Sequence, residues 1–136
     1  MKHTRNTINL LLFVAILILQ TVTVRGETLI VTATAYCNKN NNPTYSGDPT
    51  IEGVTVAGKK EWLRRKIVIY TLSENGSIDK RFGEREFTDT GYGVDSKKYP
   101  GKGTIQTGET IDIFFERYED AIQWGKRKVC IEFLED

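Results

Sequence analysis

The alternation of apolar and polar positions predicts a chain built mostly from short β-strands. Helical spacing recurs only at Tyr118, Ala121, Ile122 and Trp124, and Gly125 stands where a helix C-cap is wanted. We therefore expect one short helix over 116–124, before the last strand. The expected strands are 28–37, 53–57, 66–72, one between 78 and 88, 109–115 and 129–134. Six strands of this kind make an all-β domain, which we expect to close into a barrel.

Turn-forming residues separate these strands. Asn75-Gly76 predicts a tight hairpin turn, and 38–49 is expected to be a loop because it is rich in Asn, Pro and Gly. The segment 89–108 holds five glycines, which argues against regular structure. A loop of this length in a small domain is usually functional or mobile. Residues 59–65 are expected to form either a helical turn or a loop.

One carboxylate interrupts an otherwise apolar strand. On a strand, Ile111 and Ile113 point to one face while Asp112 and Phe114 point to the other. A carboxyl group among aromatic and β-branched residues loses water, so its pKa is expected to rise. A raised pKa suits a general acid near neutral pH. The alternative is a rim aspartate that faces solvent at a strand end.

The N-terminal residues have the pattern of a targeting segment. Lys2, His3 and Arg5 precede an unbroken apolar run over 10–19. A transmembrane helix needs about 20 apolar residues, so the run predicts a secretory signal peptide over 1–26, cut after Gly26. If it is not cut, 8–24 would serve as a short anchor. We expect a secreted protein in which 27–136 form one domain.

Loss of residues 1–26 changes the charge and the available chemistry. Three of the 19 basic residues lie in that segment, so 16 remain against 18 acidic residues. This balance gives no electrostatic support for binding nucleic acid or an anionic membrane. The single histidine, His3, is also lost, which excludes a Ser-His or Cys-His nucleophile and a histidine-based metal site. We expect neither a metal nor another cofactor, and catalysis would rest on carboxylates, lysines or hydroxyls.

Two cysteines remain, Cys37 and Cys130, near the two ends of the domain. In an oxidising compartment an even pair predicts a disulfide. Closing a loop of this length stabilises by about 4 kcal/mol in the chain-entropy model. The alternative is two unrelated thiols.

Several short motifs occur in one order along the chain: Thr34-Ala35-Tyr36, Asp89-Thr90-Gly91, I-D-I-F-F at 111–115, A-x-x-W-G at 121–125 and V-C-I at 129–131. In this order they resemble the 3D domain, which is named after three aspartates. That domain is similar to the catalytic barrel of membrane-bound lytic murein transglycosylases and of Gram-positive resuscitation and stationary-phase survival proteins. The resemblance covers most of 30–134 and implies a six-stranded double-psi β-barrel that cleaves peptidoglycan glycan strands.

The resemblance also implies a site and a location. Asp112 would be the catalytic acid and base, and Asp89 its close partner. The protein would be a monomer in the cell wall or envelope, acting without a cofactor on glycan strands. Asp112 would protonate the glycosidic oxygen, and a hydroxymethyl group of the muramoyl sugar would attack its own anomeric carbon. The residues expected to bind sugar are Thr34, Tyr36, Tyr45, Thr90 and Gly91.

Two departures from the family pattern support another function. The segment that normally carries the first aspartate reads V-A-G-K-K-E-W at 56–62. A longer segment follows Gly91, and Thr107 stands where the family has a lysine. The alternative is a non-catalytic, expansin-like barrel that binds cell-wall glycan or a protein partner. In either case Trp124 is interpreted as core packing of the helix rather than as a sugar platform.

Overall fold

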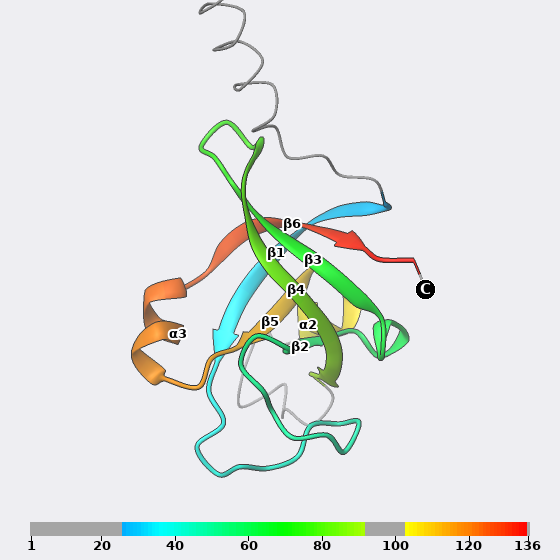
Figure 1. Ribbon diagram of the computed structural model, residues 1–136, viewed down its shortest axis with the longest axis vertical. Coiled ribbons are helices and arrows are strands. Elements are labelled where there is room, and N and C mark those ends of the chain that lie inside the picture. The colour runs from blue at the N-terminus through cyan, green and yellow to red at the C-terminus, as the bar shows by residue number, and fades with distance from the viewer. Residues whose placement is uncertain (1–25, 92–102, 136) are drawn as a thin grey trace, which may run out of the picture.

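Six strands form a closed barrel in the computed structural model (Figure 1). The structure describes residues 26–91 and 103–135. The predicted strands are all present, with ends that differ by a few residues. The strands are β1 (Thr28–Tyr36), β2 (Thr55–Gly58), β3 (Lys66–Leu72), β4 (Ile78–Thr90), β5 (Thr110–Phe114) and β6 (Arg127–Phe133). Their order around the barrel is β1-β5-β2-β4-β3-β6.

The barrel mixes parallel and antiparallel pairs. β1 pairs with β5 and β2 pairs with β4 in parallel, whereas every other neighbouring pair is antiparallel. The barrel has a twofold pattern in its strand pairings. If each strand of the first half is replaced by its counterpart in the second half (β1 by β4, β2 by β5, β3 by β6, and the reverse), the strand order around the barrel and the parallel or antiparallel direction of every pair stay the same. The two halves of the barrel therefore have equivalent strand pairings, although the sequence contains no repeat that reveals them.

Alternation along the strands fills the barrel interior. Ile111 and Ile113 are fully buried in one core cluster together with Ala33, Val56 and Phe87. Their neighbours in sequence point to the opposite face, as period-two geometry requires. The prediction that Asp112 and Ile111 occupy different faces is therefore confirmed, and Asp112 lies on the outer face of the barrel wall.

The predicted helix before the last strand is α3 (Tyr118–Trp124), which lies beside the carboxyl end of β1 (Figure 1). Gly125 ends it with φ = 67°, a conformation that favours glycine. Trp124 is buried in the core cluster, and its Nε1 donates to the carbonyl of Ala33 at 3.2 Å. The interpretation of Trp124 as core packing is confirmed.

The expectation of one helix and of an irregular 89–108 segment is wrong in part. Asp89 and Thr90 continue β4, and a second helix, α2 (Gly103–Thr107), forms just before β5. Ile105 supplies the reason, because it is buried and packs against Gly91. A single apolar residue among glycines anchors this helix. Residues 60–62 form a 3-10 turn, η1 (Lys60–Trp62).

The predicted disulfide is contradicted, because Cys37 and Cys130 are both free thiols. Cys130 lies on β6 opposite Ile30, near the start of β1, whereas Cys37 follows the last residue of β1. Seven residues of extended chain separate Ile30 from Cys37, which is roughly 20 Å. A disulfide needs Cα atoms within about 7 Å. The two strands are neighbours as expected, but their antiparallel direction places the cysteines at opposite ends.

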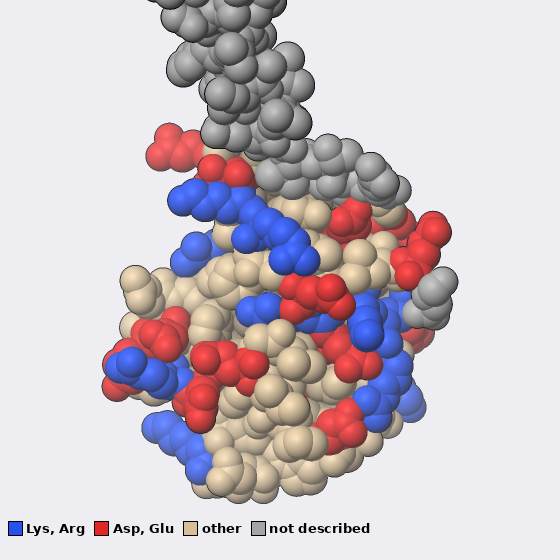
Figure 2. Space-filling model, in the orientation of Figure 1, with Lys and Arg blue, Asp and Glu red and all other residues tan. Residues whose placement is uncertain are grey.

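Some predictions fall on residues that the structure does not describe. Residues 1–25 of the predicted signal peptide lie outside the described ranges, as does most of the glycine-rich segment, 92–102. Within the described ranges, none of the helices has the length and apolar character needed to cross a membrane. Acidic and basic side chains are interspersed on the face shown in Figure 2.

Candidate functional site

Four residues form a row across four adjacent strands on the outer face of the barrel. Thr34 of β1 is in register with Asp112 of β5, Asp112 is in register with Ala57 of β2, and Ala57 is in register with Asp89 of β4. Neighbouring strands lie about 4.8 Å apart, so β2 separates the backbones at the two aspartates by roughly 10 Å. We call Thr34, Asp112, Ala57 and Asp89 the carboxylate row.

A register shift brings Asp89 into the row. Val56 is opposite Phe87, but the next residue of β2, Ala57, is opposite Asp89, so Thr88 is an extra residue in β4. An extra residue of this kind bends a strand and changes where its side chains point. Phe87 remains in the core while Asp89 contacts the outer-face residues. The first residue of the D-T-G motif, Asp89, therefore lies in the carboxylate row because of the extra residue in the pairing of β4 with β2.

Asp112 is buried although it lies on the outer face, with 4% of its surface exposed. The hydroxyl of Thr34 donates to its Oδ1 at 3.0 Å and is also 3.2 Å from the carbonyl of Ile111. Both residues are fixed by the parallel pairing of β1 with β5, so the contact depends on the backbone ladder rather than on flexible loops.

Asp89 accepts three hydrogen bonds. The hydroxyl of Tyr36 donates to Oδ2 at 3.0 Å, and the backbone N–H groups of Tyr45 and Thr90 donate to Oδ1 at 3.0 and 2.9 Å. An ionised carboxylate only accepts hydrogen bonds, which matches three donors around one group. Tyr45 belongs to the loop after β1, so Asp89 also ties that loop to β4.

Tyr36 is hydrogen-bonded to Asp89 and lies within the electrostatic range of Asp112. Burial raises the pKa of its phenol well above the ordinary value, and the charge of Asp89, the hydrogen bond to Asp89 and the charge of Asp112 each raise it further. The phenol is therefore a neutral hydrogen-bond donor at physiological pH. Its ring packs edge-on against Phe114, with centroids 5.6 Å apart. The sequence proposed Tyr36 as a sugar ligand, but the structure gives its hydroxyl a contact within the protein.

The structure brings most of the predicted site residues together. Thr34 and Tyr36 contact the aspartates through side chains, whereas Tyr45 and Thr90 do so through backbone N–H groups. The ring of Tyr45 is exposed, with Lys60 Nζ 5.7 Å from its centroid. Gly91 differs, because it directly follows β4 and lies against Ile105 of α2. It shapes the end of the strand.

Sequence reasoning missed two features. The first is Ala57, a small residue that lies between the two aspartates and that no motif marks. The second is a hollow beside α3, described below, to which Tyr118 and Ile122 contribute. The helical spacing groups them with Ala121 and Trp124, yet their surfaces are 56% and 62% exposed. The short helix buries only Ala121 and Trp124, since its outer positions extend past the barrel.

Among residues 26–91 and 103–135, no group of three or more His, Cys, Asp or Glu side chains is arranged to hold a metal ion. Comparison of the chain with protein-family models, with curated proteins and with solved structures finds no match. The carboxylate row and its hydrogen bonds are therefore the basis for assigning a function.

Proposed function

We propose that the chain is a secreted lytic transglycosylase that cleaves peptidoglycan glycan strands, built on a double-psi barrel of the 3D type. One observation carries the proposal. Asp112 is buried on the outer barrel face, in the same row as Asp89, and the hydroxyl of Tyr36 donates to Asp89 at 3.0 Å. Two carboxyl groups on one face, one of them buried, are a common arrangement for acid–base chemistry on glycosidic bonds.

The strand pairing supports the double-psi assignment. Two parallel pairs, β1–β5 and β2–β4, are joined by the antiparallel pair β2–β5, and the exchange of halves described above preserves this arrangement. The matched motifs lie on it as the resemblance implies. Thr34-Ala35-Tyr36 ends β1, Asp89-Thr90 ends β4, and Asp112 lies in the middle of β5.

Asp112 acts first as an acid in the proposed reaction. Its carboxyl proton passes to the oxygen that links N-acetylmuramic acid to N-acetylglucosamine, and this bond breaks. The carboxylate then accepts the proton of the muramoyl hydroxymethyl group, whose oxygen attacks the anomeric carbon of the same sugar. An anhydro sugar forms, no water is consumed, and Asp112 recovers its proton. One well-placed carboxyl group performs both transfers.

The neighbours of Asp112 have distinct roles. Thr34 is a positioning residue, because its hydroxyl holds Oδ1 at 3.0 Å. Asp89 is held in position by three hydrogen-bond donors. Its negative charge stabilises the positive charge that develops at the anomeric carbon in the transition state. Ala57 leaves room between the two carboxylates, because its side chain is a single methyl group. Tyr36 keeps Asp89 oriented and stays protonated.

A second candidate is a non-catalytic barrel that binds glycan or a protein partner. The observation in its favour is the β2 segment, where Ala57 and Gly58 occupy the region in which the family has its first aspartate. A Cβ on Gly58 would come within 2.4 Å of the Phe87 ring, so packing leaves little space for a larger residue there. This barrel would bind sugar on the same face without breaking bonds.

The deciding experiment incubates the purified protein with peptidoglycan and analyses soluble products by mass spectrometry. Anhydromuropeptides are expected from the unaltered protein and from Asp79→Asn, a matched change of an exposed aspartate on β4. Asp112→Asn should release none. No product from the unaltered protein, or equal product from Asp112→Asn, would overturn the enzymatic proposal. Binding of peptidoglycan without product would favour the second candidate.

A further inference from the structure

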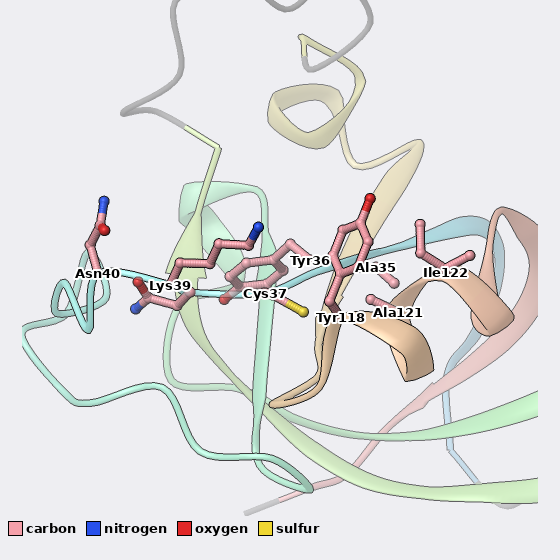
Figure 3. Close-up of a pocket in the computed structure, with 9 residues that line it drawn as sticks. Ala35, Tyr36, Cys37, Lys39, Asn40, Tyr118, Ala121 and Ile122 are labelled. Atoms are coloured by element: carbon pink, nitrogen blue, oxygen red, sulfur yellow. The ribbon is translucent and has the colours of Figure 1, made fainter.

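A hollow of about 440 Å³ lies where β1 ends and α3 begins (Figure 3). Its walls come from two segments that are far apart in sequence. The end of β1 and the turn after it contribute Ala35–Asn40, and one side of α3 contributes Tyr118, Ala121 and Ile122. Its volume falls in the range of small-molecule binding sites.

The lining combines an exposed aromatic ring, apolar side chains and a few polar groups. Tyr118 and Ile122 project from α3, and Figure 3 shows the thiol of Cys37 close to Tyr118. The ammonium group of Lys39 lies 5.0 Å from the centre of the Tyr118 ring. Such a surface offers stacking for the C–H face of a sugar, an apolar contact for an acetamido methyl group and polar partners for hydroxyls.

Tyr36 links the hollow to the carboxylate row. This residue lines the hollow, and its hydroxyl donates to Asp89. Tyr36 is also two residues beyond Thr34 on β1, which places the hollow roughly 7 Å along the strands from the register position of Asp112. If a glycan strand lies along β1 with its scissile bond over Asp112, a neighbouring sugar of the same strand would lie in this hollow.

The charges around the hollow select among possible units. Glu52, Glu119 and Asp120 lie close enough to raise the pKa of the Cys37 thiol, although burial is the largest cause and Lys39 acts in the opposite direction. Arg117 lies 3.8 Å from Glu119, so the three carboxylates outnumber two cations, Lys39 and Arg117, and this balance disfavours an acidic peptide. A neutral sugar avoids this repulsion.

We infer that the hollow formed by Cys37, Lys39, Tyr118, Ala121 and Ile122 is a sugar subsite for a neutral N-acetylated amino sugar of the same glycan strand, and this inference rests on the proposed function. Tyr118 is the stacking platform, and Ala121 and Ile122 contact the acetamido methyl group. Lys39 moves from the ring to a sugar hydroxyl. The subsite would hold the strand in place while the bond over Asp112 is cleaved.

The test measures binding in the absence of turnover. Full-length protein carrying Asp112→Asn is titrated with a short oligomer of N-acetylglucosamine by calorimetry. Adding Tyr118→Ala or Ile122→Ala should weaken binding roughly three- to tenfold. The matched control is Ile30→Ala, an isoleucine of similar exposure near the far end of β1, which should leave the affinity unchanged.

A second readout uses the thiol in the hollow. The oligomer should slow alkylation of Cys37 by iodoacetamide, and Cys37→Ser should remove the labelled site. Equal affinities for Tyr118→Ala and Ile30→Ala together with unprotected Cys37 would overturn the subsite even if the unaltered protein releases anhydromuropeptides. Binding and protection without any such product would keep the subsite and reject the lytic reaction. Absence of binding would reject the subsite.

Discussion

The hydroxyl of Tyr36 donates a hydrogen bond of 3.0 Å to Oδ2 of Asp89, although 53 positions separate the two residues in sequence. Tyr36 ends β1 and Asp89 is near the end of β4, and these strands are not neighbours in the barrel. The bond therefore spans β5 and β2, the two strands between them. It holds the phenol of Tyr36 over the strands between β1 and β4, one of which, β5, carries Asp112.

Removing this hydroxyl should weaken the fold as well as the site. Tyr36→Phe retains the ring packing against Phe114 but leaves Asp89 with only its two backbone donors among the hydrogen bonds described above. The free energy of unfolding should fall by about 1.5–3 kcal/mol, as for a hydrogen bond to a charged group. Urea denaturation measures the change. Tyr118→Phe, on the exposed face of α3, is the control and should change stability little.

The same variant should change the alkaline limit of stability. Tyrosine in an unfolded chain ionises near pH 10, whereas the pKa of folded Tyr36 lies well above that value because of burial and the charge of Asp89. Above about pH 10 the folded state retains a proton that the unfolded state releases, so stability falls as pH rises. Urea midpoints at increasing alkaline pH should decline less steeply for Tyr36→Phe. An identical decline in both proteins would contradict the assigned shift.

The contact between Thr34 and Asp112 should matter for reaction more than for folding. Thr34→Val keeps a β-branched side chain on β1 but removes the donor at 3.0 Å. If Asp112 is the acid, the rate of anhydromuropeptide release should fall roughly fivefold, which corresponds to about 1 kcal/mol of lost positioning. Thr34→Ser, which restores a hydroxyl, should recover most of the rate. Failure of serine to do so would assign the effect to packing.

The close approach at Gly58 predicts a strong steric effect. An ideal Cβ there would lie 2.4 Å from Cε1 of Phe87 and 3.3 Å from Cε3 of Trp62. Gly58→Ala should therefore lower the unfolding free energy by about 1–3 kcal/mol, as overpacking does. Gly103→Ala is the control, because a Cβ at that position meets nothing within 4 Å. A stability for Gly58→Ala equal to that of the control would show that the Phe87 ring moves aside.

The two thiols should react differently. Cys37 is partly exposed and Cys130 is buried, and they are not bridged. Without reductant, iodoacetamide should therefore label one thiol in the folded protein and two after unfolding, as counted by mass spectrometry. Dithiothreitol should leave the unfolding midpoint unchanged. A midpoint that falls with reductant would indicate a bond that the structure lacks.

Patterns of local periodicity predicted much of the fold. Strand 66–72 was predicted at the residues observed for β3, and Gly125 marked the end of α3. These features depend on neighbours in sequence, which is why the sequence reveals them. The short helix α2 was missed because its single buried residue, Ile105, gives no period.

Long-range features were less accessible. Cys37 and Cys130 were expected to meet, since the first and last strands pair, but the direction of pairing decides which residues face each other. The residues around the aspartates were identified by motif, yet the register shift that aligns Asp89 with Ala57 depends on how β2 and β4 pack. Helical spacing groups Tyr118 and Ile122 with the buried Ala121 and Trp124, but it does not show where the barrel wall ends, and both side chains are exposed.

The position of β1 in the barrel has a consequence for when the site can fold as the chain is synthesised. Among the described strands it bonds only with β5 and β6, so nothing in the first two thirds of the chain can pair with it. Contacts of such long range form slowly and late. Thr34 can therefore reach Asp112 only after β5, in the last third of the chain, has been made. If the protein cuts wall polymers, an unfinished chain has no assembled site with which to cut them.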